Sequence, residues 1–75
     1  MLVAIDQILI FKTNIKTIAD KERVQHALDT HDYIDQWNID QQDIDCVLRV
    51  ISISLTADQI INLINQHGFD CAELE

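Results

Sequence analysis

The chain has 75 residues, with 5 Lys and Arg against 13 Asp and Glu, and its formal net charge is −8 at pH 7. This length predicts one domain over residues 1–75, with a core just large enough to fold without metal or disulfide bonds. The acidic balance excludes nucleic acid and anionic membranes as partners, because phosphate groups would be repelled, and it allows a basic protein partner or a cation. The apolar run from Met1 to Phe11 lacks a basic start and is too short to span a bilayer. The default expectation is therefore a cytoplasmic protein.

The first half of the chain predicts a strand followed by a helix. Alternation over residues 8–13 indicates the strand, which residues 3–5 would extend. Thr17-Ile18-Ala19-Asp20 fits a capping box, in which the first and last side chains each accept a backbone N–H from the other residue. The helix should begin near Thr17 and close at His31–Asp32. Its inward stripe is predicted to comprise Val24, Ala27, Leu28 and His31.

The second half repeats this pattern. Residues 33–40 predict a strand whose uneven apolar spacing indicates a bulge near Gln36, and residues 45–54 predict a third strand. Thr56-Ala57-Asp58-Gln59 is a second capping box, and Gly68 is placed to end the second helix in a left-handed conformation. Residues 69–74 predict a last strand. The second helix should bury Ile60, Leu63, Ile64 and His67.

The predicted order is strand–helix–strand–strand–helix–strand. With right-handed crossovers this gives an α+β, ferredoxin-like βαββαβ fold, a four-stranded antiparallel sheet with two helices on one face. The other face stays open, and its branched apolar side chains form a patch larger than a monomer usually exposes. We expect this patch to serve as an interaction face for a second copy or another protein, with Arg49 orienting the contact. Its predicted residues are Ile8, Ile10, Val47, Arg49 and Ile51.

Four segments together resemble the heavy-metal-associated domain, the small module of copper chaperones and copper-transporting ATPases. They are FKTNIK at residues 11–16, WNID at residues 37–40, VLRV at residues 47–50, and the helix and glycine of residues 60–69. The resemblance extends from about Ile8 to Leu74. It implies the ferredoxin-like fold and a lineage of metal binding or metal delivery.

The sequence departs from this family at the metal site. The family's Met-x-Cys-x-x-Cys motif falls on residues 15–20, where Ile15 replaces the methionine and Thr17 and Asp20 replace the two ligand cysteines. Paired thiolates suit Cu(I), whereas a hydroxyl and a single carboxylate are poor ligands for so soft an ion. We therefore predict a degenerate site without tight Cu(I) binding and no cofactor, with a transition-metal ion as the weaker alternative.

The remaining ligand and catalytic candidates are weaker. His67 and Cys71 could hold a soft cation with a third group, but packing at the edge of the core is the favoured interpretation. A disulfide between Cys46 and Cys71 is not expected, because their strands should flank the first strand about 9–10 Å apart. The strand–helix loop lacks a glycine-rich phosphate cradle and an arginine. The sequence therefore predicts a protein that is not an enzyme.

Overall fold

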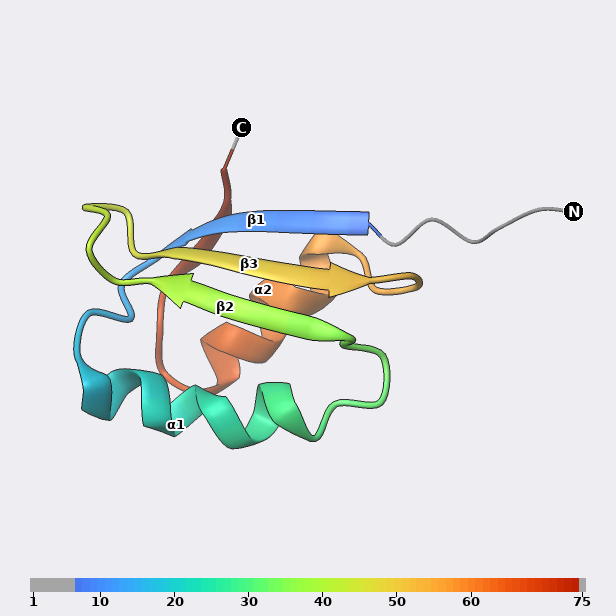
Figure 1. Cartoon of the computed structure of the whole chain (residues 1–75), viewed down its shortest axis with the longest axis horizontal. Coiled ribbons are helices and arrows are strands. Elements are labelled where there is room, and N and C mark those ends of the chain that lie inside the picture. The colour runs from blue at the N-terminus through green and yellow to red at the C-terminus, as the bar shows by residue number, and fades with distance from the viewer. Residues whose placement is uncertain (1–6, 75) are drawn as a thin grey trace, which may run out of the picture.

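The computed structural model describes residues 7–74 (Figure 1) and contains the six predicted elements in the predicted order. The expected extension of the first strand over residues 3–5 lies outside the described residues. Among the described residues, no helix is long and apolar enough to cross a bilayer. The elements are β1 (Gln7–Thr13), α1 (Ile18–Asp29), β2 (Gln36–Asp40), β3 (Val47–Ser52), α2 (Ala57–Gln66) and β4 (Cys71–Glu73).

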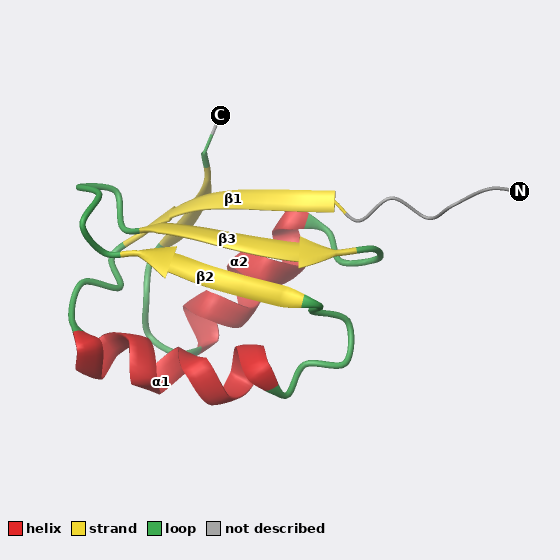
Figure 2. Cartoon of the chain, viewed as in Figure 1, coloured by secondary structure: helices red, strands yellow, loops and turns green. Residues whose placement is uncertain are grey.

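The four strands form one antiparallel sheet in the order β2-β3-β1-β4 (Figures 1 and 2). In β1 and β3 the side chains alternate between buried and exposed, as shown by Phe11 beside Lys12 and by Leu48 beside Arg49. Side chains that alternate along a strand point to opposite faces, so one face holds the core and the other is open. The ferredoxin-like fold is confirmed.

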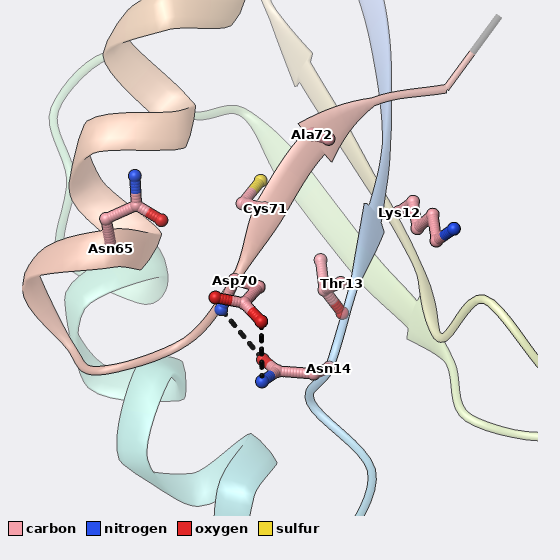
Figure 3. Close-up of a pocket in the computed structure, with 7 residues that line it drawn as sticks. All are labelled: Lys12, Thr13, Asn14, Asn65, Asp70, Cys71 and Ala72. Carbon is pink, nitrogen blue, oxygen red and sulfur yellow. Dashed lines mark hydrogen bonds between the residues drawn. The ribbon is translucent and has the colours of Figure 1, made fainter.

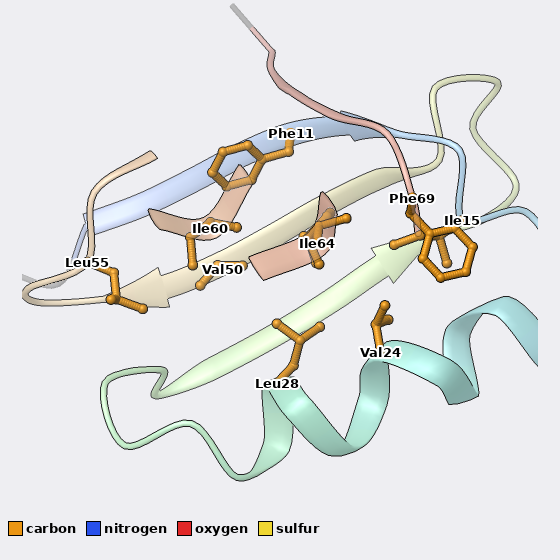
Figure 4. Close-up of a cluster of buried hydrophobic side chains, with 10 residues drawn as sticks. Phe11, Ile15, Val24, Leu28, Val50, Leu55, Ile60, Ile64 and Phe69 are labelled. Carbon is orange, nitrogen blue, oxygen red and sulfur yellow. The ribbon is translucent and has the colours of Figure 1, made fainter. Parts of the chain in front are cut away.

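The core lies between the sheet and both helices. Val24 and Leu28 of α1 and Ile60 and Ile64 of α2 pack with the inward side chains of β1 and β3 (Figure 4). Full burial of a Val, Leu or Ile side chain contributes about 1.5–3 kcal/mol, so these stripes hold the helices on the sheet. The full cluster is Phe11, Ile15, Val24, Leu28, Leu48, Val50, Leu55, Ile60, Ile64 and Phe69.

Both helices begin at the predicted threonines, and both capping boxes are present. The prediction that the first helix closes at His31–Asp32 was wrong, since α1 ends at Asp29 with Thr30 as its C-cap. The backbone N–H and the hydroxyl of Thr30 both donate to the His26 carbonyl, at 3.0 and 2.7 Å. A threonine hydroxyl that binds the preceding turn favours the end of a helix.

The predicted glycine stop is confirmed at Gly68, which has a φ of +88°. Its N–H donates to the Asn65 carbonyl at 3.0 Å, and the N–H of Phe69 donates to the Ile64 carbonyl at 3.3 Å. These two bonds form a Schellman motif, which places the buried Phe69 against the buried Ile64 in the core cluster.

The strands β2, β3 and β4 are shorter than predicted. The N–H of Asp35 donates to the Ile51 carbonyl at 2.9 Å, while Gln36 is the register partner of the same Ile51. Two residues against one is the pairing of a β-bulge, which agrees with the irregularity expected near Gln36. Cys46, predicted inside the third strand, instead precedes β3 with a φ of 44°, which is incompatible with a strand.

Candidate functional site

The loop between β1 and α1, residues 14–17, is where the resemblance places the first part of the metal motif. Ile15, at the methionine position, is 0% exposed and belongs to the core cluster. Thr17, at the first cysteine position, is the exposed N-cap of α1, and Asp20, at the second, is the third residue of the helix. The structure therefore brings Thr17 and Asp20 together in the capping box that the sequence predicted.

Backbone N–H groups donate to one oxygen of each side chain in this cap. The Thr17 Oγ1 accepts the N–H of Asp20 at 3.0 Å, and the Asp20 Oδ2 accepts the N–H groups of Lys16 and Thr17, each at 3.2 Å. Partial burial tends to raise the pKa of Asp20, but the bonds from Lys16 and Thr17, with the nearby charge of Arg23, outweigh it and lower the pKa from 3.8. The carboxylate is thus held ionised by the backbone it caps.

A glutamine from the β2–β3 turn fixes the loop from outside. The Nε2 of Gln41 donates to the Thr17 carbonyl at 2.7 Å and to the Ile15 carbonyl at 3.3 Å. One side-chain amide thereby donates to the two carbonyl groups on either side of Lys16. Both carbonyl oxygens are therefore engaged in hydrogen bonds that hold the loop in place. Sequence reasoning missed Gln41, because nothing in a polar turn 24 residues away from Thr17 indicates this contact.

Two further side chains fasten the start of the loop. The Thr13 hydroxyl donates to the Cys46 carbonyl at 2.7 Å and accepts the N–H of Ile15 at 3.2 Å. The Asn14 Oδ1 accepts the N–H of Asp70 at 2.8 Å, and the Asn14 Nδ2 donates to the Asp70 Oδ2 at 3.3 Å (Figure 3). The loop is therefore bonded to the β2–β3 turn and to the segment before β4, and sequence spacing revealed neither contact.

The alternative ligand pair, His67 and Cys71, lies at the end of α2 and the start of β4. The Nδ1 of His67 donates to the Leu63 carbonyl at 2.9 Å, which withdraws one ring nitrogen from coordination. Burial raises the pKa of the Cys71 thiol to about 12. A thiol must lose its proton to bind a soft ion, so both observations favour the packing interpretation. Among residues 7–74, no group of three or more His, Cys, Asp and Glu side chains could hold a metal ion.

A cavity of about 270 Å³ adjoins Cys71 (Figure 3). It lies along the short edge strand β4, next to the Asn14–Asp70 pair, and the side chain of Lys12 points away from the other side chains that line it. These side chains do not form a nucleophile with an adjacent base, which covalent catalysis requires. Its lining residues are Lys12, Thr13, Asn14, Asn65, Asp70, Cys71 and Ala72.

Four of the five residues predicted for the interaction face are exposed or half-buried on the open face of the sheet. Ile8 is 63% exposed, Arg49 is exposed, and Ile10 and Ile51 are half-buried. Val47, predicted to be accessible, is only 4% exposed. Val47 pairs with Asp40 of β2, and on the β1 side it lies one residue beyond the Phe11–Leu48 pair, next to Lys12. The long apolar stem of Lys12 can cover the valine from that side. The strand residues of this open face are Ile8, Ile10, Lys12, Gln36, Asn38, Asp40, Val47, Arg49, Ile51 and Ala72.

Comparison with known proteins rests on structure alone. No protein-family model matches the sequence, and no curated protein matches it. The fold is similar to that in a solution structure of the Atx1-Cu(I)-Ccc2a complex, with a TM-score of 0.76 and 21% identity over 91% of this chain and 94% of that chain. It is also similar to the apo form of the HMA domain of copper chaperone for superoxide dismutase, with a TM-score of 0.77 and 12% identity over 93% of this chain and 70% of that chain. The resemblance to heavy-metal-associated domains is thus confirmed for the fold.

Proposed function

We propose that this chain is a non-enzymatic domain of metal-chaperone lineage that acts through protein contacts and does not hold Cu(I) at its former metal loop. One observation carries the proposal: Oγ1 of Thr17 and Oδ2 of Asp20, at the two ligand positions, accept backbone N–H groups at the helix start. A metal ion bound by these two oxygens would have to compete with those hydrogen bonds. The loss of an N-cap costs about 1 kcal/mol, and a hydroxyl and a carboxylate give little affinity for Cu(I) in return.

The lineage is supported by the two similar structures, one of a complex that contains Cu(I) and one of a copper-chaperone domain. The absence of enzymatic activity is supported by the thiols. Cys46 is buried. The pKa of Cys71 is raised to about 12, so the Cys71 thiol stays protonated and weakly nucleophilic near neutral pH. A location in the cytoplasm is part of the same proposal.

A Cu(I) competition titration tests the proposal. The wild-type chain, titrated against a strong chelator of Cu(I), should leave the copper with the chelator. The double variant Thr17→Cys, Asp20→Cys should withdraw copper from it, because paired thiolates restore soft ligands at the same corner. The matched control, Thr17→Ser with Asp20→Asn, retains capping side chains without sulfur and should behave as the wild type.

Two results would contradict the proposal. Stoichiometric copper uptake by the wild-type chain that Thr17→Ala or Asp20→Ala removes would show that the loop still binds the ion. Uptake that survives those changes but is lost in Cys71→Ser would move the site to His67 and Cys71. The second variant keeps a small side chain at a half-buried position, so the fold should persist.

A further inference from the structure

The open face of the sheet exposes apolar side chains and carries a net positive charge, although the protein as a whole is acidic. Ile8 is 63% exposed, and Ile10 and Ile51 beside it are half-buried, so a contiguous apolar area reaches solvent at one end of β1 and β3. Three charged residues lie on this face: the positive Lys12 and Arg49 and the negative Asp40. The face therefore has one excess positive charge, whereas the whole chain has a net charge of −8.

This distribution restricts how two copies could meet. Two molecules with a charge of −8 repel each other over most of their surfaces. Contact through the open face avoids the acidic side chains of the turns and helices. It also buries branched apolar side chains that a small monomer would otherwise leave in water.

The charges of this face are arranged in a self-complementary order. Asp40 of β2 pairs with Val47 of β3, and Lys12 of β1 pairs with Ala72 of β4. The last β1–β3 pair is Phe11–Leu48, and Lys12 and Val47 are the next residues beyond it, so one row across the sheet runs Asp40, Val47, Lys12 and Ala72. A two-fold axis parallel to the strands, between β3 and β1, reverses this row in the second copy. Asp40 of each copy then lies over Ala72 and next to Lys12 of its partner, while Arg49 lies over the partner's Ile10.

From this arrangement we propose that the open face is a self-association surface, which pairs two copies face to face about this axis through reciprocal Asp40–Lys12 contacts. The inference rests on the proposed function, since a domain without a bound ion acts through protein contacts. The dimer can be tested separately from copper binding, because no residue of the loop between β1 and α1 takes part in the contact. An isologous contact of this kind closes as a dimer and does not extend into fibres.

The size of the face sets the expected strength of the dimer. Four short strands spaced about 4.8 Å apart, with a rise of about 3.4 Å per residue, give a flat footprint of about 350 Å². A specific, stable interface buries about 800 Å² on each partner. We therefore expect a reversible dimer with a dissociation constant on the order of 100 µM.

Sedimentation equilibrium from about 1 µM to about 1 mM tests this range. The wild-type chain should change from monomer to dimer across it. Lys12→Glu and Asp40→Lys should each weaken the dimer roughly tenfold or more, and the double variant should restore it, because the exchange inverts both contacts. The control Lys21→Glu makes the same change of charge on α1 and should leave the dimer unaffected.

Circular dichroism and thermal unfolding of each variant establish that it is folded before its mass is compared. A monomer at every concentration overturns the inference. A dimer that ignores both single changes also overturns it, since the contact would then lie elsewhere. A double variant as weak as the singles would reject the two-fold arrangement.

Discussion

The two helix starts are built from one motif and differ in what surrounds it. Thr17 with Asp20 and Thr56 with Gln59 form the same reciprocal capping box, and each N-cap is extended. The start of α1, where the resemblance places the metal motif, has the same cap geometry as the start of α2. This corner therefore has the construction of an ordinary helix start.

Different side chains hold the chain segment that precedes each capping box. Before α2, the buried Leu55 precedes the N-cap and the buried Ile60 is four residues past it, which is the spacing of a hydrophobic staple. The corresponding positions of α1 are Lys16 and Lys21, so no staple can form there. Its loop is instead fastened by the buried Ile15 and by long-range hydrogen bonds.

The largest loss of stability should come from removing the buried side chains of Ile15 and Leu55, one before each helix. Ile15→Ala and Leu55→Ala each empty a buried position and should lower the free energy of unfolding by about 3 kcal/mol. Equal losses would show that the loop is as firmly packed as the start of α2. Urea denaturation followed by circular dichroism measures both. A loss below about 1 kcal/mol for Ile15→Ala would mean that the loop is held chiefly by its hydrogen bonds.

Removal of the caps should have a smaller effect. Thr17→Ala and Thr56→Ala should each cost about 1 kcal/mol of stability, because the backbone N–H of Asp20 or of Gln59 loses its side-chain acceptor. The matched variants Thr17→Ser and Thr56→Ser keep a hydroxyl acceptor and should retain most of the wild-type stability. Thermal unfolding compares the four proteins. A Thr17→Ala variant as stable as the wild type would contradict the assignment of this residue as a cap.

The smallest effect should be in the response to acid. The pKa of Asp20 is lowered below 3.8 in the folded chain, so its contribution to stability is complete above pH 3.8 and is lost as the pH falls through the lowered value. Asp20→Asn should flatten this part of the stability profile. Gln59 caps the second box without charge, so Gln59→Asn should leave the acid response unchanged. Denaturation at a series of pH values from neutral to strongly acidic makes the comparison.

Much of the site could be predicted because its signals are local. A capping box depends on residues three positions apart, and a glycine stop depends on one φ, so Thr17, Asp20, Thr56 and Gly68 were placed from the sequence. The strand ends could not be placed so well. Alternation continues through Cys46, and the left-handed turn that excludes it from β3 arises from the path of the β2–β3 turn.

The sequence by itself determined the order of the elements, the two helix starts and the oxygen-bearing side chains at positions 17 and 20, because each depends on residue type at short spacing. Only the tertiary structure decided what holds the loop closed, through Gln41 and the Asn14–Asp70 pair, and that Val47 lies buried on the open face. These contacts join residues 24 to 56 positions apart. Their formation depends on the packing of the whole sheet, which no local pattern encodes.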